Sequence, residues 1–248
     1  MGGDLISEMR FTSLASSSRG NAYLVQADGV SPLLLEAGLP IKQLRDKLRD
    51  QEVLLSDLEA CLISHEHGDH SKAVKDLLRA GVDCYMSIGT ANKLGVGGHH
   101  RLHPLFTEVT IGIPGDWLIL SFPLEHDATE PFGFFIGHGD EHLLFVADTE
   151  LIKNRFEAPT IIAVETNYQE EILHENISKG YLPSIVGKRT RRNHMSLKTV
   201  KDFLLANDLS RCREIHLLHL SSGNSDEEAM RKEIQEITGI PVYIAQEQ

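Results

Sequence analysis

The sequence predicts a mixed α/β fold, of the α+β kind, in which two β-rich halves pack as a four-layer αββα sandwich. Three observations support this prediction. Short strand-like runs separated by turn residues open the chain, a second group of such runs fills its middle, and helical and strand patterns alternate in its last third. Because no repeat, low-complexity tract or linker interrupts the chain, residues 1–248 are expected to form a single domain.

The first half of the chain should form an antiparallel meander that leads into alternating helices and strands. Turn residues occupy positions 16–21 and 28–29, and helical spacing of leucines begins near Leu39. The glycine-rich segment 95–100 can only be a loop. Strands are expected over 9–14, 21–26, 32–36, 60–64 and 83–87, with a helix over 71–80.

The second half should supply the other sheet and the C-terminal helices. Ser196 has the position of an N-cap for a helix that buries Val200, Phe203 and Leu204, and a last helix should begin at about Asp226. Strands are expected over 117–122, 132–138, 142–147, 160–164 and 214–220.

The composition is that of an ordinary globular chain, with 41% hydrophobic and 24% charged residues. No segment approaches the roughly 18 apolar residues of a membrane helix, and residues 1–8 lack the basic and apolar parts of a secretory signal. We therefore expect a cytoplasmic protein with no membrane partner. Cys61, Cys84 and Cys212 are too scattered for a disulfide framework or a CxxC metal site. The formal net charge of −12 disfavours long-range attraction of a polyanion, so any nucleic acid must be held locally.

A dense group of metal-binding side chains follows the expected strand at 60–64, in the run His65-Glu66-His67-Gly68-Asp69-His70. Three imidazoles and a carboxylate within six residues cannot share one regular face, so they must converge from a loop. Neutral imidazoles bind zinc, and a carboxylate balances the charge of a divalent ion. The run therefore predicts half of a metal site. A second histidine group, His99, His100 and His103, lies in and beside the glycine-rich loop and is interpreted as surface.

Further ligands are expected where later strands end. His126 follows the strand at 117–122, Asp148 directly follows the apolar run at 143–147, and His219 closes the strand that begins at Glu214. Each residue alone would more often be structural. Together, at strand ends and in this order, they indicate that the site is completed by these side chains.

These residues resemble the metallo-β-lactamase superfamily, and other segments narrow the likeness to its YycJ/WalJ-like branch. The resemblance covers most of the chain. The segments that carry it are 13–21, His126-Asp127-Ala128 with Pro131 and Gly133, Glu165-Thr166-Asn167, Asn193-His194-Met195-Ser196, and His219-Leu220-Ser221 with Asn224.

The resemblance implies a site for two divalent metal ions, zinc or manganese, with a water held between them as the attacking hydroxide. It assigns His65, His67 and His126 to one ion, Asp69, His70 and His219 to the other, and Asp148 to both. Asp69 is accordingly predicted to be both a metal ligand and a catalytic residue. Glu36, which stands where the superfamily usually has aspartate, is expected to support a ligand histidine.

His194 stands where phosphodiesterases of this superfamily carry a histidine near the scissile phosphate, which implies a second catalytic residue, acting as general acid or phosphate contact. It follows the basic run 188–192. A charge run is usually a solvated loop. Cations beside a proton donor nevertheless suit an anionic phosphate. The candidate substrate contacts are Arg189, Arg191, Arg192 and Asn193.

The function that the resemblance implies is binuclear-metal-dependent phosphodiester hydrolysis of nucleic acid, as in a DNA or RNA exonuclease, by attack of a metal-bridging hydroxide. One alternative is a cyclic-nucleotide phosphodiesterase of the phage anti-Pycsar type, which the acidic net charge favours. Another is an ester or thioester hydrolase of the glyoxalase II or lactonase type, which shares the metal motif but not the His194 motif. Zinc lactamases have cysteine where Asp148 stands. A non-enzymatic binding protein is disfavoured because every ligand position is intact, and a homodimer is compatible with the superfamily.

Overall fold

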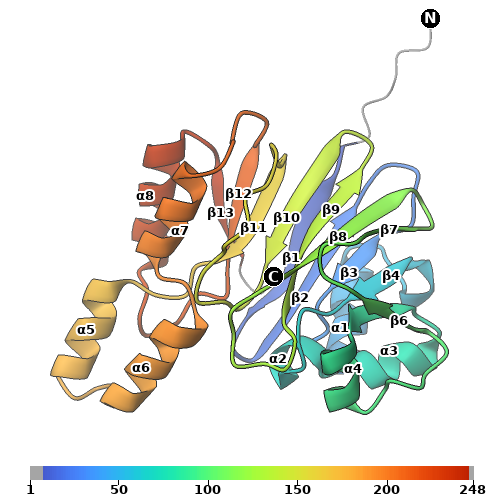
Figure 1. The fold of residues 1–248 in the computed structure, drawn as a ribbon, viewed down its shortest axis with the longest axis horizontal. Helices are drawn as coiled ribbons and strands as arrows, with labels where there is room; N and C mark the ends of the chain where they lie inside the picture. Colours follow the sequence, from blue (N-terminus) through green and yellow to red (C-terminus); the bar gives the residue numbers. More distant parts are fainter. Residues whose placement is uncertain (1–7, 246–248) are drawn as a thin grey trace, which may run out of the picture.

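The computed structural model describes residues 8–245 as two mixed β-sheets that face each other, with helices on the outer side of each sheet (Figure 1). The six-stranded sheet has the order β1-β2-β3-β4-β5-β6, and the seven-stranded sheet has the order β13-β12-β11-β10-β9-β8-β7. The predicted four-layer αββα sandwich is confirmed. Residues 1–7, most of the segment used to argue against a secretory signal, lie outside the described residues.

The elements have the following bounds. The strands are β1 Arg10–Ser17, β2 Gly20–Gln26, β3 Leu33–Leu35, β4 Ala60–Leu62, β5 Cys84–Ser87, β6 Leu102–Leu105, β7 Thr110–Ile113, β8 Trp117–Pro123, β9 Phe132–His138, β10 Glu141–Val146, β11 Ile161–Glu165, β12 Glu214–Leu218 and β13 Val242–Ile244. The helices are α1 Ile41–Asp50, the 3-10 turn Leu55–Asp57, α2 Gly68–Ser71, α3 Val74–Ala80, α4 Ile88–Leu94, α5 Glu170–Ser178, α6 Ser184–Asn193, α7 Leu197–Leu205 and α8 Glu227–Thr238. Within residues 8–245, none of these helices combines the length and apolar character needed to span a membrane.

Three hydrophobic clusters hold the four layers together. The cluster between the sheets joins Leu62 of the first sheet to Phe145 of the second. Leu77 of α3 belongs to the cluster on the outer face of the first sheet, and Phe203 of α7 and Met230 of α8 belong to the cluster on the outer face of the second. Residues 143–146 of β10 and 161–164 of β11 are buried on both faces, which explains why these stretches are continuously apolar instead of alternating.

The strand directions bring distant parts of the sequence to one edge. Strands β3 to β6 run parallel in the first sheet, and β10 to β13 run parallel in the second. The carboxyl ends of parallel strands meet at the same edge of a sheet. The run from His65 follows β4, Asp148 follows β10, Glu165 ends β11 and His219 follows β12.

The sequence predicts the two capped helices correctly. The Ser196 hydroxyl accepts a hydrogen bond from the Thr199 amide at 3.1 Å and begins α7, and the Asp226 carboxylate accepts one from the Ala229 amide at 3.0 Å and begins α8. Because the cap fixes where α7 starts, it also fixes the position of His194, two residues before Ser196.

Several elements are not predicted by the sequence, namely α4, α5, α6, β6, β7 and β13. The basic run 188–192 lies in α6 and does not form the solvated loop that a charge run usually indicates. The physical reason is that α6 has no apolar stripe facing a core. Its large apolar residues, Ile185 and Val186, are exposed, so the period of an amphipathic helix is missing.

Gly38 marks a close contact between the segment after β3 and the histidine run. A Cβ atom on Gly38 would lie 1.7 Å from the backbone oxygen of Asp69 and 2.7 Å from the amide nitrogen of Asn21. The neighbouring Ala37 amide donates a hydrogen bond to the His70 carbonyl at 2.7 Å. Since backbone atoms surround the position, Gly38 sets how closely the run can approach the first sheet.

We expect Gly38→Ala to destabilise the protein by about 2 to 3 kcal/mol, because backbone must move to admit the methyl group. Urea denaturation measures the change. Gly98→Ala is the matched control, since nothing lies within 4 Å of the added Cβ there. Equal stability of the two variants would contradict this role of Gly38.

Candidate metal centre

The predicted ligands lie at the shared edge of the sheets, and most of them line one hollow of about 370 Å³. The hollow also receives residues from helix α6, among them Arg189 and Asn193, two of the candidate substrate contacts. Its lining is Ser18, His67, Gly68, Asp69, His126, Asp127, Asp148, Val186, Arg189, Thr190, Asn193, His194 and His219.

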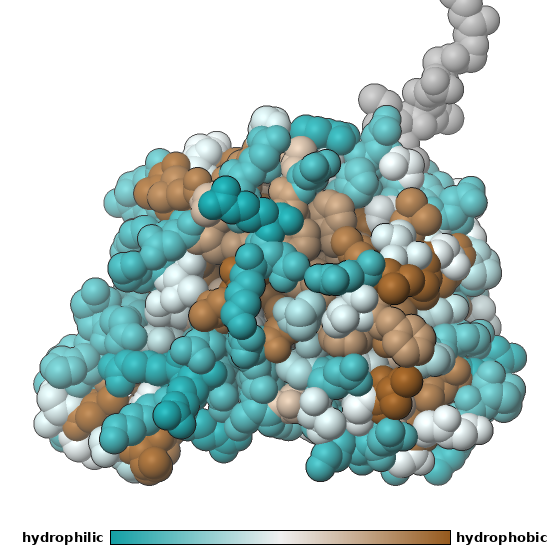
Figure 2. Space-filling model, in the orientation of Figure 1, coloured by the Kyte–Doolittle hydropathy of each residue, from teal (hydrophilic) through white to brown (hydrophobic). Residues whose placement is uncertain are grey.

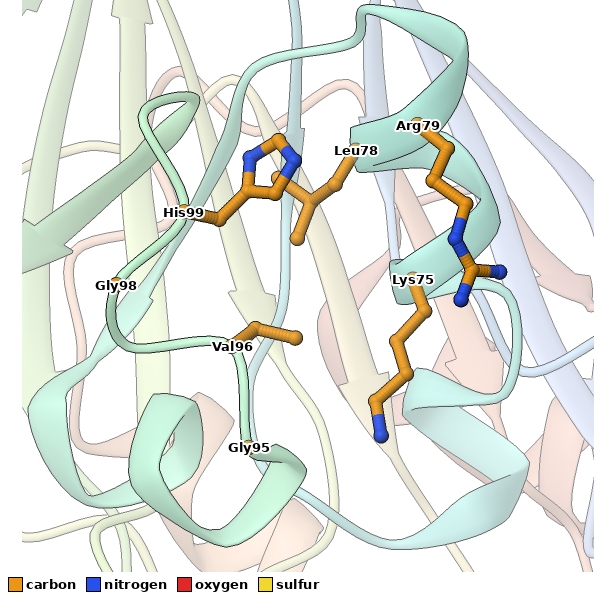
Figure 3. Close-up of a pocket in the computed structure, with 7 residues that line it drawn as sticks. All are labelled: Lys75, Leu78, Arg79, Gly95, Val96, Gly98 and His99. Atoms are coloured by element: carbon orange, nitrogen blue, oxygen red, sulfur yellow. The ribbon is translucent and has the colours of Figure 1, made fainter.

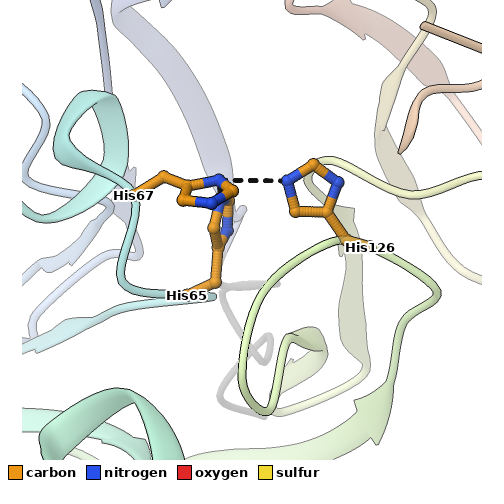
Figure 4. A group of neighbouring side chains, drawn as sticks. All are labelled: His65, His67 and His126. Atoms are coloured by element: carbon orange, nitrogen blue, oxygen red, sulfur yellow. Dashed lines mark hydrogen bonds between the residues drawn. The ribbon is translucent and has the colours of Figure 1, made fainter. Parts of the chain in front are cut away.

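His65, His67 and His126 form the first group of convergent side chains (Figure 4). The His67 Nδ1 atom lies 3.1 Å from the Nε2 atom of His65 and 3.1 Å from the Nε2 atom of His126. Nitrogens bound to one zinc ion at 2.0–2.1 Å in a tetrahedron are about 3.3 Å apart. The three nitrogens therefore have the spacing of ligands around one ion.

Outer hydrogen bonds and burial prepare two of these rings for a metal. The Ser64 hydroxyl lies 2.8 Å from His65 Nδ1, and His126 Nδ1 donates to the Asn193 carbonyl at 2.9 Å. Each bond occupies the outer nitrogen and leaves Nε2 directed inward. Burial lowers the pKa of the His65 imidazole well below its usual range and also lowers that of His126. Both rings are neutral at neutral pH, as metal ligands must be.

Asp69, His70, Asp148 and His219 form the second group. The His70 Nε2 atom lies 3.6 Å from Asp69 Oδ2 and 3.5 Å from Asp148 Oδ1, and His219 Nδ1 lies 2.8 Å from the same Asp148 oxygen. The other Asp148 oxygen lies 3.9 Å from His126 Nε2 in the first group. Asp148 thus presents one oxygen to each group, which suits a carboxylate shared by two ions.

The charges of the second group also suit a cation. His70 Nδ1 is buried and makes no hydrogen bond among the described residues, and the buried Asp148 Oδ1 has the His70 and His219 rings beside it. Although burial opposes it, the Asp148 carboxylate raises the pKa of His219 to about 10. Without an ion, a proton on His219 therefore supplies the positive charge that the buried carboxylate requires. The residues present fit a divalent metal, which would take the place of that proton.

Glu36, which is predicted to support a ligand histidine, lies beside His70. Its carboxylate is fully buried, accepts a hydrogen bond from the Ser64 amide at 3.2 Å and lies 3.6 Å from His70 Nδ1. Glu36 and His219 both have backbone φ in the left-handed region, at 62° and 53°. Non-glycine residues in this region are strained and gather at functional sites.

The opening hairpin holds the second group from the opposite side. The Ser16 hydroxyl accepts a hydrogen bond from the His219 amide at 2.9 Å. The Asn21 side-chain amide donates to the Asp69 carbonyl at 3.3 Å and lies 3.2 Å from His70 Nε2. The segment 13–21, one of the motifs behind the family resemblance, therefore positions ligands without being one.

Glu165 is the principal residue that the sequence analysis did not assign to the site. It is buried, its Oε1 atom lies 2.5 Å from His194 Nδ1 and 3.1 Å from His219 Nδ1, and its Oε2 atom accepts from the Thr149 amide at 3.0 Å. The available signal was its place directly after the apolar residues 161–164, the same relation that singled out Asp148.

His194 lies between the two groups. Its ring centroid is 5.6 Å from that of His126 and 5.4 Å from that of His219. Burial opposes protonation, but the Glu165 carboxylate raises the pKa of His194. Asp148, Glu165, His194 and His219 could also hold an ion together. We favour an ion pair for Glu165 and His194, because their short contact already satisfies both charges.

The predicted substrate contacts are only partly brought together. Arg189 and Asn193 line the hollow, and Arg189 also pairs with Asp127 at 3.2 Å. Arg191 is held by Glu170 of α5 at 2.9 Å, and both Arg191 and Arg192 line a neighbouring hollow instead of the metal hollow.

A separate hollow of about 470 Å³ lies between α3 and the glycine-rich loop (Figure 3). Lys75, Arg79 and His99 surround it, with no carboxylate among its lining residues. Across residues 8–245, no potential metal group includes His99, His100 or His103. The interpretation of these histidines as surface residues agrees with this arrangement.

A comparison with protein-family models matches residues 33–206 to a family described as Beta-lactamase superfamily domain. The chain belongs to the metallo-β-lactamase superfamily. Exodeoxyribonuclease WalJ of Streptococcus pneumoniae is 28% identical over 230 residues, which cover 88% of this chain and 84% of that protein. Exodeoxyribonuclease YycJ of Bacillus anthracis is 25% identical over 243 residues, which cover 92% and 89%.

Solved structures support the same fold. The metallo-β-lactamase fold protein YhfI from Bacillus subtilis has a TM-score of 0.71 at 18% identity and covers 96% of this chain and 97% of that one. A diphosphatase from the PhnP family has a TM-score of 0.66 at 16% identity, with 95% of each chain covered. As a member of this superfamily with convergent histidine and aspartate groups, the chain is a metal-dependent hydrolase.

We expect Asp148→Ala to lose more bound metal than His126→Ala, because the two Asp148 oxygens lie within 4 Å of histidines from both groups. Equilibrium dialysis against zinc or manganese, followed by elemental analysis, measures the bound metal. His174→Ala, at an exposed histidine of α5, should keep the wild-type content. Full metal content in Asp148→Ala would rule out a shared carboxylate.

Proposed function

We propose that this chain hydrolyses phosphodiester bonds of nucleic acid, in the manner of an exonuclease, with two divalent ions of zinc or manganese. The observation that carries the proposal is the pair His194 and Glu165, which sets a proton donor between the two ligand groups. The names of the two curated relatives, both exodeoxyribonucleases, support the same substrate class.

Each residue has a defined task in the proposed reaction. Divalent ions held by the two groups would activate water and neutralise phosphate charge. His194, kept protonated by Glu165, would donate a proton from its Nε2 to the leaving oxygen. Arg189, at the rim of the hollow, would contact a non-bridging phosphate oxygen. The carboxylates of Asp69 and Asp148 would balance part of the positive charge of the ions.

Two alternatives keep the fold and change the substrate. The net charge of −12 and the small size of the hollow, about 370 Å³, favour a cyclic nucleotide of the type cleaved by phage anti-Pycsar enzymes. Ester or thioester hydrolysis of the glyoxalase II or lactonase type has no comparable support, because it makes no use of the His194–Glu165 pair.

A substrate panel with defined metals tests the proposal. We expect hydrolysis of single-stranded DNA or RNA and of bis(p-nitrophenyl) phosphate, abolished in Asp69→Ala. His194→Ala should lower kcat by about 10²- to 10⁴-fold, the usual contribution of a general acid. His174→Ala is again the control. Turnover of cyclic nucleotides or S-lactoylglutathione without turnover of polymers would point to the corresponding alternative.

The pH dependence of kcat provides an independent test of the His194–Glu165 pair. A general acid must be protonated, so the rate falls as the pH rises through its pKa. Glu165 raises the pKa of His194. Glu165→Gln should therefore move the alkaline limb of the kcat profile to lower pH. A lower rate with an unmoved limb would instead indicate a purely structural role for Glu165.

A further inference from the structure

A second hollow, of about 720 Å³, adjoins the metal hollow along helix α6. Asp127, Val186, Arg189 and Asn193 line both hollows, so the two form one continuous groove. The reaction proposed above takes place in the first hollow and makes no use of the second.

Helix α6 packs closely against α5. A Cβ atom on Gly187 would lie 2.3 Å from the Cδ1 atom of Ile177, so the two helices touch there without room for a side chain. On the next turn, Arg191 binds the Glu170 carboxylate through two nitrogens, at 3.1 Å from Nε and 2.9 Å from Nη2. Arg191 also lines the second hollow, so its pairing with Glu170 fixes part of the wall of the groove.

The free face of α6 combines apolar and cationic side chains. Ile185, Lys188 and Arg192 recur at helical spacing and line the second hollow. Ile185 is 72% exposed and Val186 is 43% exposed, and Figure 2 shows apolar surface on the projection that α5 and α6 form. In the part of the chain that the structure describes, neither Lys188 nor Arg192 has an ion-pair partner.

This combination matches the chemistry of a nucleotide. Exposed apolar side chains beside a functional site mark a contact surface for an apolar group. Proteins that bind single strands join apolar or planar surfaces for the bases to cations for the backbone. In a duplex the base faces are stacked on their neighbours, so only an unpaired base can lie on Ile185 and Val186.

We propose that the second hollow is a subsite for an unpaired nucleotide next to the scissile phosphate. Its base lies on Ile185 and Val186, and its flanking phosphate is bound by Lys188 and Arg192. The proposal rests on the phosphodiesterase function and adds the substrate class: a single strand or unpaired end of at least two nucleotides, and not a cyclic mononucleotide.

Binding of a single strand tests the subsite directly. Fluorescence anisotropy with a labelled phosphorothioate DNA strand gives Kd for the metal-loaded wild type and for two variants outside the metal hollow. Ile185→Asp should raise Kd by about tenfold, since a base contact is lost and a repelling charge is added. Lys188→Ala should raise Kd by a smaller factor. A blunt duplex should bind more weakly than the strand.

Controls make the same chemical changes elsewhere. Leu205→Asp replaces a side chain on α7 that is 64% exposed, and Lys232→Ala removes an exposed cation from α8. Neither should change Kd. Thermal melting of each variant confirms that these exposed positions leave the fold intact.

Hydrolysis separates failure of the subsite from failure of the proposed function. Bis(p-nitrophenyl) phosphate needs only the metal hollow, so Ile185→Asp should cleave it at the wild-type rate while kcat/KM for DNA falls with affinity. Unchanged DNA binding and cleavage in Ile185→Asp overturns the subsite and leaves the function standing. Equal loss of both substrates also overturns it. A wild type that cleaves no phosphodiester, yet binds the strand through Ile185, overturns the function alone.

Discussion

The buried carboxylate of Asp148 is the group on which the rest of the site depends. It is 3% exposed, and a buried carboxylate without compensation is unfavourable by several kcal/mol. His70 and His219 lie against one of its oxygens and His126 against the other. His70 follows β4, His219 follows β12 and His126 follows β8. The Asp148 carboxylate therefore contacts loops from both sheets. The ligand groups are thus assembled by the same interaction that makes a cation favourable between them.

The backbone around this charge is strained and is held in place by the first sheet. Glu36 and His219 adopt left-handed backbone conformations that side chains other than glycine rarely occupy. Each is anchored by hydrogen bonds to other segments: Glu36 receives the Ser64 amide, and the His219 amide donates to Ser16. The sandwich core stabilises these segments and thereby positions the predicted ligands. Preorganisation of this kind is what a metal site requires of its scaffold.

The sequence predicts the site better than it predicts the elements around it. Dense ligand types at strand ends leave a local signal, which is why the run from His65, together with His126, Asp148 and His219, is visible without a structure. Glu165 also comes directly after an apolar run, but it is predicted only as part of the Glu165-Thr166-Asn167 motif and without a role in the site. The sequence fails to predict helix α6 for another reason. Its apolar residues face solvent, so the periodicity that reveals a buried face is absent, and its basic run has the composition of a loop.

The net charge of −12 gives helix α6 a particular importance. Over distances beyond the Debye length, about 10 Å at 0.1 M salt, an acidic surface does not attract a polyanion. Affinity for nucleic acid must then arise from contacts made within the groove itself. In the groove, Arg189 forms an ion pair with Asp127. A phosphate that binds Arg189 therefore replaces the Asp127 carboxylate and gains little net interaction. Lys188 and Arg192 have no such partner among the described residues, and a phosphate bound to them gains the full interaction. The basic run is therefore where an acidic protein could still recognise a nucleic acid strand.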